Sequence, residues 1–231
     1  MLICGLQKLS LLDYPEKLAA TIFTGGCNMR CPFCHNALLV TRLSESETIS
    51  EDELMSFLSK RQGILDGVCI TGGEPLLQND LEDFIVKIRS LGFKIKLDTN
   101  GTFPDKLSIL LNKGLIDYVA MDIKNSPEKY PLTVGQLDFD VIPVLESASI
   151  LMKGSVPYEF RTTLVREFHS FEDIEKIGKL LRGAKNYYLQ SFEDSGDLVG
   201  ASSVLSALSP EETEHCRMIL SKYIENVIIR N

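Results

Sequence analysis

The feature that most restricts the fold of this chain is a repeated alternation of short β-branched runs with helical patterns. Most of these runs are nearly continuous stretches of apolar residues, as expected of parallel strands that are covered on both faces. Strand–helix alternation of this kind predicts an α/β fold, built either as a sheet or as a barrel. The six predicted strands span residues 18–24, 67–71, 94–99, 118–124, 158–165 and 186–192.

The segments between these strands carry helix start signals. Ser50 and Glu53 form a capping-box pattern ahead of an apolar periodic run. Before the last helix, Ser209, Pro210 and Glu212 combine an N-cap, a first-turn proline and a capping-box acid. The helices are therefore predicted from local chemistry as well as from periodicity.

Composition limits the class of protein and its partners. A chain of 231 residues with 44% hydrophobic and 24% charged residues is expected to be one globular domain covering residues 1–231. It has no apolar run long enough to cross a bilayer and no signal peptide at its start, so we expect a cytoplasmic protein without a membrane partner. The net charge of −8, without a stripe rich in Lys and Arg, argues against nucleic acid as a partner.

Unusual polar residues follow each of the six predicted strands. Because the carboxyl ends of parallel strands converge on one face, these residues are expected to share one mouth, which is typical of an active site. In strand order they are the Cys27–Cys34 loop, Gly72-Gly73-Glu74-Pro75, Thr99-Asn100-Gly101, Asp122 with Lys124, Arg161, and Gln190.

Three of the six cysteines are crowded into the spacing C-x₃-C-x₂-C, as Cys27, Cys31 and Cys34. Zinc prefers a filled tetrahedron, usually from two paired C-x₂-C knuckles, and the second knuckle is absent here. His35 is an awkward fourth zinc ligand because it is the immediate neighbour of Cys34. A [4Fe–4S] cluster is larger, so three cysteines on one wrapped loop can each bind one corner and leave the fourth iron open to a small molecule.

With an aromatic residue, Phe33, directly before its last cysteine, this motif resembles the radical S-adenosylmethionine (radical SAM) signature. Further motifs narrow the resemblance to the activases of glycyl-radical enzymes, and they follow that family's order over most of the chain. The chain is most similar to activating proteins of anaerobic ribonucleoside-triphosphate reductase, whose N-terminal stretch resembles LLDYP at residues 11–15. The other motifs are FTGGCNMRCPFCHN at residues 23–36, TGGEP at 71–75, LDTNG at 97–101 and MDIK at 121–124.

The resemblance implies a fold and an activity. The fold would be a partial (β/α)₆ TIM-like barrel with its active site at the C-terminal ends of the strands. It would be open laterally because it has six strands rather than eight. The activity would be reductive cleavage of S-adenosylmethionine at a single [4Fe–4S] cluster, with an electron from flavodoxin or ferredoxin, followed by removal of a hydrogen atom from a glycine of a partner enzyme.

The resemblance also implies roles for individual residues. Cys27, Cys31 and Cys34 would hold the cluster. Phe33 would lie against the adenine of S-adenosylmethionine, and His35 would pack beside it or else bond within the loop. The remaining cofactor-binding residues implied by the family pattern are Gly72, Gly73, Glu74, Asp98, Thr99, Asp122, Lys124, Arg161 and Gln190.

Several of these roles are specific. The turn with Gly72, Gly73 and Glu74 would meet the methionine amino group, with the glycines leaving the cofactor unobstructed. Asp98 and Asp122 would lie beside the methionine part of the cofactor and possess the oxygen ligands that suit a monovalent cation. Lys124 would pair with the cofactor carboxylate.

Two further roles depart from the family pattern or remain open. Gln190, or Glu193, would replace a histidine that many activases carry after the sixth strand. Arg161 matches a family arginine but is also placed to neutralise Asp98 or Asp122.

Two other functions remain open from the sequence. One is a radical SAM enzyme that acts on a small molecule, such as a deazapurine or a cofactor precursor. The other is a binding module stabilised by zinc, without catalysis, which the missing second knuckle disfavours.

Overall fold

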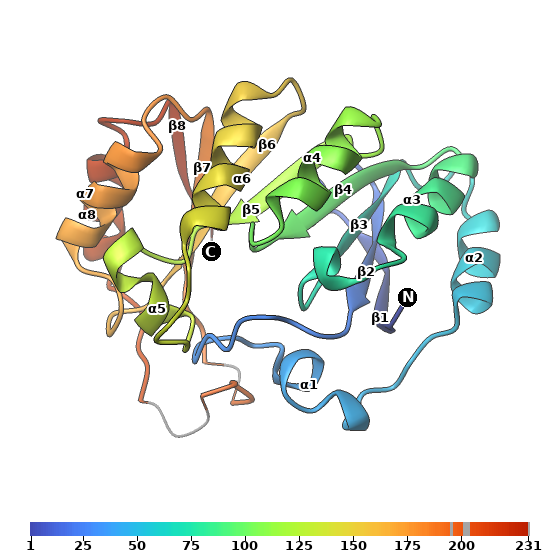
Figure 1. Ribbon diagram of the computed structural model, residues 1–231, viewed down its shortest axis with the longest axis horizontal. Helices are drawn as coiled ribbons and strands as arrows, with labels where there is room; N and C mark the ends of the chain where they lie inside the picture. The colour runs from blue at the N-terminus through green and yellow to red at the C-terminus, as the bar shows by residue number, and fades with distance from the viewer. Residues whose placement is uncertain (195, 201–203, 231) are drawn as a thin grey trace.

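The computed structural model describes residues 1–194, 196–200 and 204–230, and its centre is one curved sheet of eight strands (Figure 1). The strands follow one another across the sheet in chain order, from β1 at one edge to β8 at the other. Strand β1 is antiparallel to β2, and every later neighbouring pair is parallel. The strands are β1 (Ile3–Ser10), β2 (Ala19–Thr24), β3 (Gly67–Gly72), β4 (Lys94–Thr99), β5 (Tyr118–Asp122), β6 (Tyr158–Leu164), β7 (Asn186–Ser191) and β8 (Asn226–Arg230).

The longer helices form an arc around the outside of the sheet, while α1 and the segment before it cross the opposite side (Figure 1). The start signals act as predicted: Ser50 accepts a hydrogen bond from the Glu53 amide, and Ser209 with Glu212 forms a complete capping box. The α-helices are α1 (Ala37–Val40), α2 (Glu51–Ser59), α3 (Leu81–Ser90), α4 (Pro104–Asn112), α5 (Tyr130–Thr133), α6 (Ile142–Lys153), α7 (Phe171–Leu180) and α8 (Pro210–Leu220). Short 3₁₀ helices are η1 (Leu43–Glu45), η2 (Pro75–Leu77) and η3 (Pro127–Lys129).

The six strands predicted from the sequence are confirmed as β2 to β7. Their apolar runs are buried because helices cover the outer face while side chains fill the inner one. In β3, for example, Val68, Cys69 and Ile70 are fully buried. Cys69 is buried as predicted, but its Sγ lies beside charged groups, 3.7 Å from Asp98 Oδ1 and 3.8 Å from Lys96 Nζ.

Two strands were missed, and the predicted reason for the lateral opening was wrong. Strands β1 and β8 lie at the edges of the sheet, so many of their residues are exposed or half-buried. Among the described residues the sheet has eight strands, yet it stays open because β1 and β8 are not neighbours. The opening therefore comes from unpaired edges and not from a low strand number.

The parallel strands position the site by bringing the loops that follow them to one edge of the sheet. Thr24 at the end of β2 is in register with Gly72 at the end of β3, so the loops after these two strands start side by side. Within the described residues, none of the helices has both the length and the apolar character needed to cross a bilayer.

Candidate active site

The three clustered cysteines face one cavity. Cys27, Cys31 and Cys34 line a cavity of about 280 Å³ at the carboxyl edge of the sheet. Their loop is tied to the segment after β5, because the Arg30 amide donates a hydrogen bond of 2.9 Å to the Val134 carbonyl. The structure thus brings together the three predicted cluster ligands.

Burial affects the thiols of this loop. It raises the pKa of Cys31 to about 12, with the nearby Lys124 charge offsetting part of the effect. Burial also raises the pKa of Cys27. These thiols are therefore protonated without a metal, and iron binding must displace their protons, as metal binding to thiols does generally.

The cysteines do not form a site for a single ion. Across residues 1–194, 196–200 and 204–230, no three Cys, His, Asp or Glu side chains gather around one point that a metal ion would occupy. A zinc ion needs every ligand sulfur about 2.3 Å from the same centre. Three thiols spread around a shared cavity suit a multi-iron group better, since each corner is bound separately.

The turn after β3 is packed directly against the cysteine loop. The Gly73 amide donates to the Thr24 carbonyl, and the Glu74 amide donates to the Gly26 carbonyl, both at 2.8 Å. A Cβ atom on Gly73 would lie only 1.9 Å from the Gly26 oxygen, and Gly72 has a φ of +113°. Both glycines line the cavity. At Gly73, however, the missing side chain makes room for backbone of the cysteine loop, which differs from the predicted role of leaving a cofactor unobstructed.

The Glu74 side chain is directed away from the cavity. Its side chain is fully buried and does not line the cavity. It accepts hydrogen bonds from the Leu76 amide at 3.0 Å, the Thr99 hydroxyl at 2.8 Å and the Asn100 amide at 2.6 Å. Because its oxygens are directed at the chain itself, Glu74 joins the turn after β3 to the end of β4 and does not bind a cofactor through its side chain.

The burial of Glu74 gives a pH-dependent prediction. Burial raises its pKa from 4.5 to about 7. Between these values the folded protein binds the proton and the unfolded chain does not, so stability falls as pH rises through this window. We expect the difference in free energy of unfolding between the wild type and Glu74→Gln to change by roughly 3 kcal/mol from pH 4.5 to 7. Urea unfolding at a series of pH values measures it, and a constant difference would contradict the assignment.

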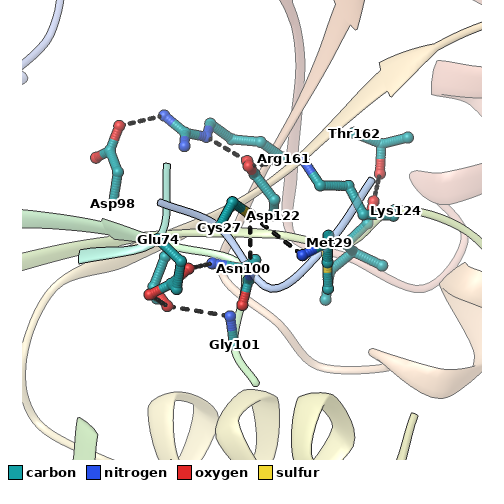
Figure 2. A network of polar contacts seen from close by, with 12 residues as sticks. Cys27, Met29, Glu74, Asp98, Asn100, Gly101, Asp122, Lys124, Arg161 and Thr162 are labelled. Atoms are coloured by element: carbon teal, nitrogen blue, oxygen red, sulfur yellow. Dashed lines mark hydrogen bonds and ion pairs between the residues drawn. The ribbon is translucent and has the colours of Figure 1, made fainter. Parts of the chain in front are cut away.

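Charged side chains from three strands form a connected network at the cavity (Figure 2). Arg161 on β6 lies between two carboxylates: its Nε is 2.9 Å from Asp122 Oδ1, and one terminal nitrogen is 3.0 Å from Asp98 Oδ2. Lys124 Nζ is 2.9 Å from the other oxygen of Asp122. The second oxygen of Asp98 pairs with Lys96 of the same strand. The predicted alternative for Arg161, neutralisation of the aspartates, is therefore confirmed in geometry.

The network keeps its members charged. Burial acts to raise the pKa of Asp122, but the charges of Arg161 and Lys124 outweigh it and hold that pKa well below its usual range. The pKa of Asp98 is likewise lowered, by Arg161 and Lys96 against the effect of burial. Three cations and two carboxylates give the whole network one net positive charge, and the third cation, Lys96, lies behind the cavity lining. This wall of the site is suited to an anionic group.

The predicted monovalent cation finds no support in this arrangement. All four carboxylate oxygens of Asp98 and Asp122 are already paired with Lys96, Arg161 or Lys124. A further cation would meet net positive charge. Lys96, which is 2% exposed, was missed by sequence reasoning. A signal existed, since Lys96 and Asp98 are two residues apart on one buried strand and so point to the same side.

The remaining predicted residues lie at the same cavity. It is also lined by Phe33, His35, Thr99 and Gln190. Phe33 is buried, with its ring centroid 5.8 Å from that of Phe168. His35 is exposed, and its ring centroid is 5.7 Å from that of Phe192. The cavity further includes lining residues that sequence reasoning did not assign: Met29, Asn36, Val40, Thr71, Asn100 and Thr163.

Comparison with known proteins decides the family. The sequence matches the radical SAM superfamily over residues 21–181, from within β2 to the start of the segment after α7. The chain belongs to the radical SAM superfamily. The three clustered cysteines and the strands that carry the network all fall inside the matched residues.

The relatives of this radical SAM enzyme differ in the share of their own length that aligns with this chain. "Putative glycyl-radical enzyme activating enzyme MJ1227" of Methanocaldococcus jannaschii is 36% identical over 99% of this chain and 95% of its own length. GTP 3′,8-cyclase of Helicobacter pylori is 27% identical over 87% of this chain and 61% of its own length. The crystal structure of Streptococcus suis SuiB bound to precursor peptide SuiA has a TM-score of 0.70 at 13% identity, over 91% of this chain and 48% of SuiB, which confirms the fold.

Membership in the superfamily implies a [4Fe–4S] cluster and S-adenosylmethionine as cofactors. The residues present fit both. Three thiols on one loop line the cavity, and Arg161 and Lys124 line it as members of a charged network that also contains Asp98, Asp122 and Lys96. The donor set therefore suits iron, and the charged wall suits the carboxylate of an amino acid group.

Proposed function

We propose that this radical SAM enzyme is an activase that generates a glycyl radical on a partner enzyme. One observation carries the proposal: a relative named for activation of glycyl-radical enzymes is 36% identical over 99% of this chain, without a large uncovered part on either side.

The chemistry divides between the cofactors and the chain. When bound, the reduced cluster and S-adenosylmethionine supply a 5′-deoxyadenosyl radical, which takes a hydrogen atom from a glycine Cα and becomes 5′-deoxyadenosine. In our proposal Cys27, Cys31 and Cys34 hold the cluster, and the Lys124 ammonium pairs with the cofactor carboxylate. Lys124 is suited to this because Asp122 and burial fix its position, and Asp122 keeps its pKa raised.

Other residues of the cavity complete the proposed cofactor site. Backbone groups of Gly72 and Gly73 meet the methionine amino group, and Phe33 and His35 lie by the adenine. Asp98, Asp122 and Arg161 act mainly by holding one another and Lys124 in place. Thr99 and Gln190 also line the cavity.

The partner and the electron donor are proposed from the family resemblance. We propose anaerobic ribonucleoside-triphosphate reductase as the partner, on the resemblance of LLDYP and the later motifs, and flavodoxin or ferredoxin as the electron donor, in the cytoplasm. We also propose that residues 1–231 form one domain, since the single sheet begins at Ile3 and ends at Arg230.

A second candidate function is catalysis on a small molecule. It is favoured by the match to GTP 3′,8-cyclase, which covers 87% of this chain. Two facts weigh against it: the identity is lower, at 27%, and more than a third of the cyclase has no counterpart here.

The proposed activity predicts a radical on a protein. After anaerobic loading with iron and sulfide, the chain is mixed with reductant, S-adenosylmethionine and a purified anaerobic reductase. We expect a glycine-centred doublet in the electron paramagnetic resonance (EPR) spectrum, with 5′-deoxyadenosine formed in proportion. A reductase whose radical-site glycine is changed to Ala is the control and should give no doublet. A loaded enzyme that cleaves the cofactor but gives no doublet with any glycyl-radical enzyme, and instead converts GTP, would support the second candidate.

A further inference from the structure

The Asn100 side chain, just after β4, has an orientation fixed by its neighbours. It is 6% exposed. Its Oδ1 accepts hydrogen bonds from the backbone amide of Thr102 at 3.0 Å and from the Thr102 hydroxyl at 2.6 Å. Because a backbone amide can only donate, this end of the side chain must be the oxygen. The NH₂ group therefore faces the opposite direction, toward the cysteine loop.

That NH₂ group has two acceptors in the cysteine loop (Figure 2). Asn100 Nδ2 is 2.9 Å from Asn28 Oδ1 and 3.9 Å from Cys27 Sγ. The Met29 amide approaches the same sulfur at 3.4 Å. In the part of the chain that the structure describes, the Sγ atoms of Cys31 and Cys34 receive no such N–H donor.

The backbone of Asn100 is held as firmly as its side chain. Its amide donates a hydrogen bond of 2.6 Å to the buried carboxylate of Glu74. Glu74 in turn belongs to the turn that is bonded to Gly26 of the cysteine loop. The turn that contains Glu74 thus holds both Asn100 and the cysteine loop, which fixes the Asn100 amide donor relative to the Cys27 sulfur.

We propose that Asn100 sets the reduction potential of the cluster by donating a hydrogen bond to the Cys27 thiolate. Reduction adds negative charge to the cluster and its sulfur ligands, and an N–H donor stabilises that charge, so the donor raises the potential. The effect is strengthened by burial, since the local dielectric constant is low. The inference depends on the cluster that family membership implies and is independent of the partner's identity.

The test measures the potential directly, without partner or turnover. Full-length protein is loaded anaerobically with iron and sulfide and titrated with reductant while EPR follows the reduced cluster. Asn100→Leu keeps a similar shape but removes the donor. We expect about a tenfold smaller equilibrium constant for reduction, which is a midpoint lower by about 59 mV for one electron. Asn100→Asp, which also lacks the N–H, should lower the midpoint too.

A matched control distinguishes loss of the Asn100 N–H donor from loss of the Thr102 hydroxyl, which only supports the Asn100 side chain. Thr102→Val removes a hydroxyl that bonds both Asn100 and Asn28 but leaves the amide facing Cys27. Its midpoint should stay near that of the wild type. Unchanged midpoints in the loaded Asn100 variants would overturn the proposal, and so would a Thr102→Val shift equal to theirs. Failure of both Asn100 variants to take up iron, while Thr102→Val loads normally, would also overturn it, since Asn100 would then be a structural residue.

Discussion

Replacing Cys31 by Ala is expected to abolish both cluster binding and cleavage of S-adenosylmethionine. Cys31 is the most buried of the three clustered cysteines and lines the cavity with the other two. With one thiolate removed, two protein ligands remain for a group that needs a sulfur at each of three corners. Iron and acid-labile sulfide after anaerobic loading measure the binding, and 5′-deoxyadenosine formed with reductant measures the cleavage.

The chain provides a matched control for this variant. Cys216 on α8 is also buried but does not line the cavity, so Cys216→Ala removes a thiol of similar burial elsewhere. It should bind wild-type amounts of iron and still form 5′-deoxyadenosine. A Cys31→Ala protein that continues to cleave the cofactor would show that the ligand set is wrong, whatever its effect on stability.

The location of the site was predictable from the sequence because the carboxyl ends of parallel strands all lie at the same edge of the sheet. Polar residues at the carboxyl ends of parallel strands share one edge of the sheet, so Cys27, Thr99, Asp122 and Arg161 were expected at one mouth without any knowledge of side-chain geometry. The structure places all four at one cavity. The same rule does not say where a side chain points, so it could not show that the Glu74 side chain is directed away from the cavity.

What sequence reasoning missed depends on pairing partners that are distant in the chain. Strands β1 and β8 pair on one side only, so their residues lack the uniform apolar character of the central strands. Lys96 was missed although it lies two residues before Asp98 on the same strand, and its place in the network depends on the contact between Asp98 and Arg161. Asn100 needs Thr102 and the cysteine loop to fix its orientation. Each of these is a property of contacts, and contacts are not encoded by local pattern.

Removing Arg161 is expected to cause the largest loss of stability among single changes in the charged network. Its guanidinium lies between Asp98 and Asp122, and its side chain is 14% exposed. Arg161→Leu leaves two buried carboxylates near each other without the cation they share. We expect the free energy of unfolding to fall by roughly 3–5 kcal/mol at neutral pH, the usual cost of leaving a buried charge unpaired. Urea unfolding measures it.

The pH dependence and a surface control sharpen this prediction. Arg161 holds the pKa of Asp122 below its usual range, so the stability it contributes is present at neutral pH and is lost as pH falls through the lowered pKa. The deficit of Arg161→Leu should therefore shrink as pH falls, because the variant's carboxylates lack the Arg161 charge and take up protons at a higher pH than those of the wild type. Arg166→Leu removes an arginine that pairs with Glu212 at the surface, where water screens the ion pair, and should cost far less. Equal losses in the two variants, independent of pH, would mean that the network contributes packing and not charge.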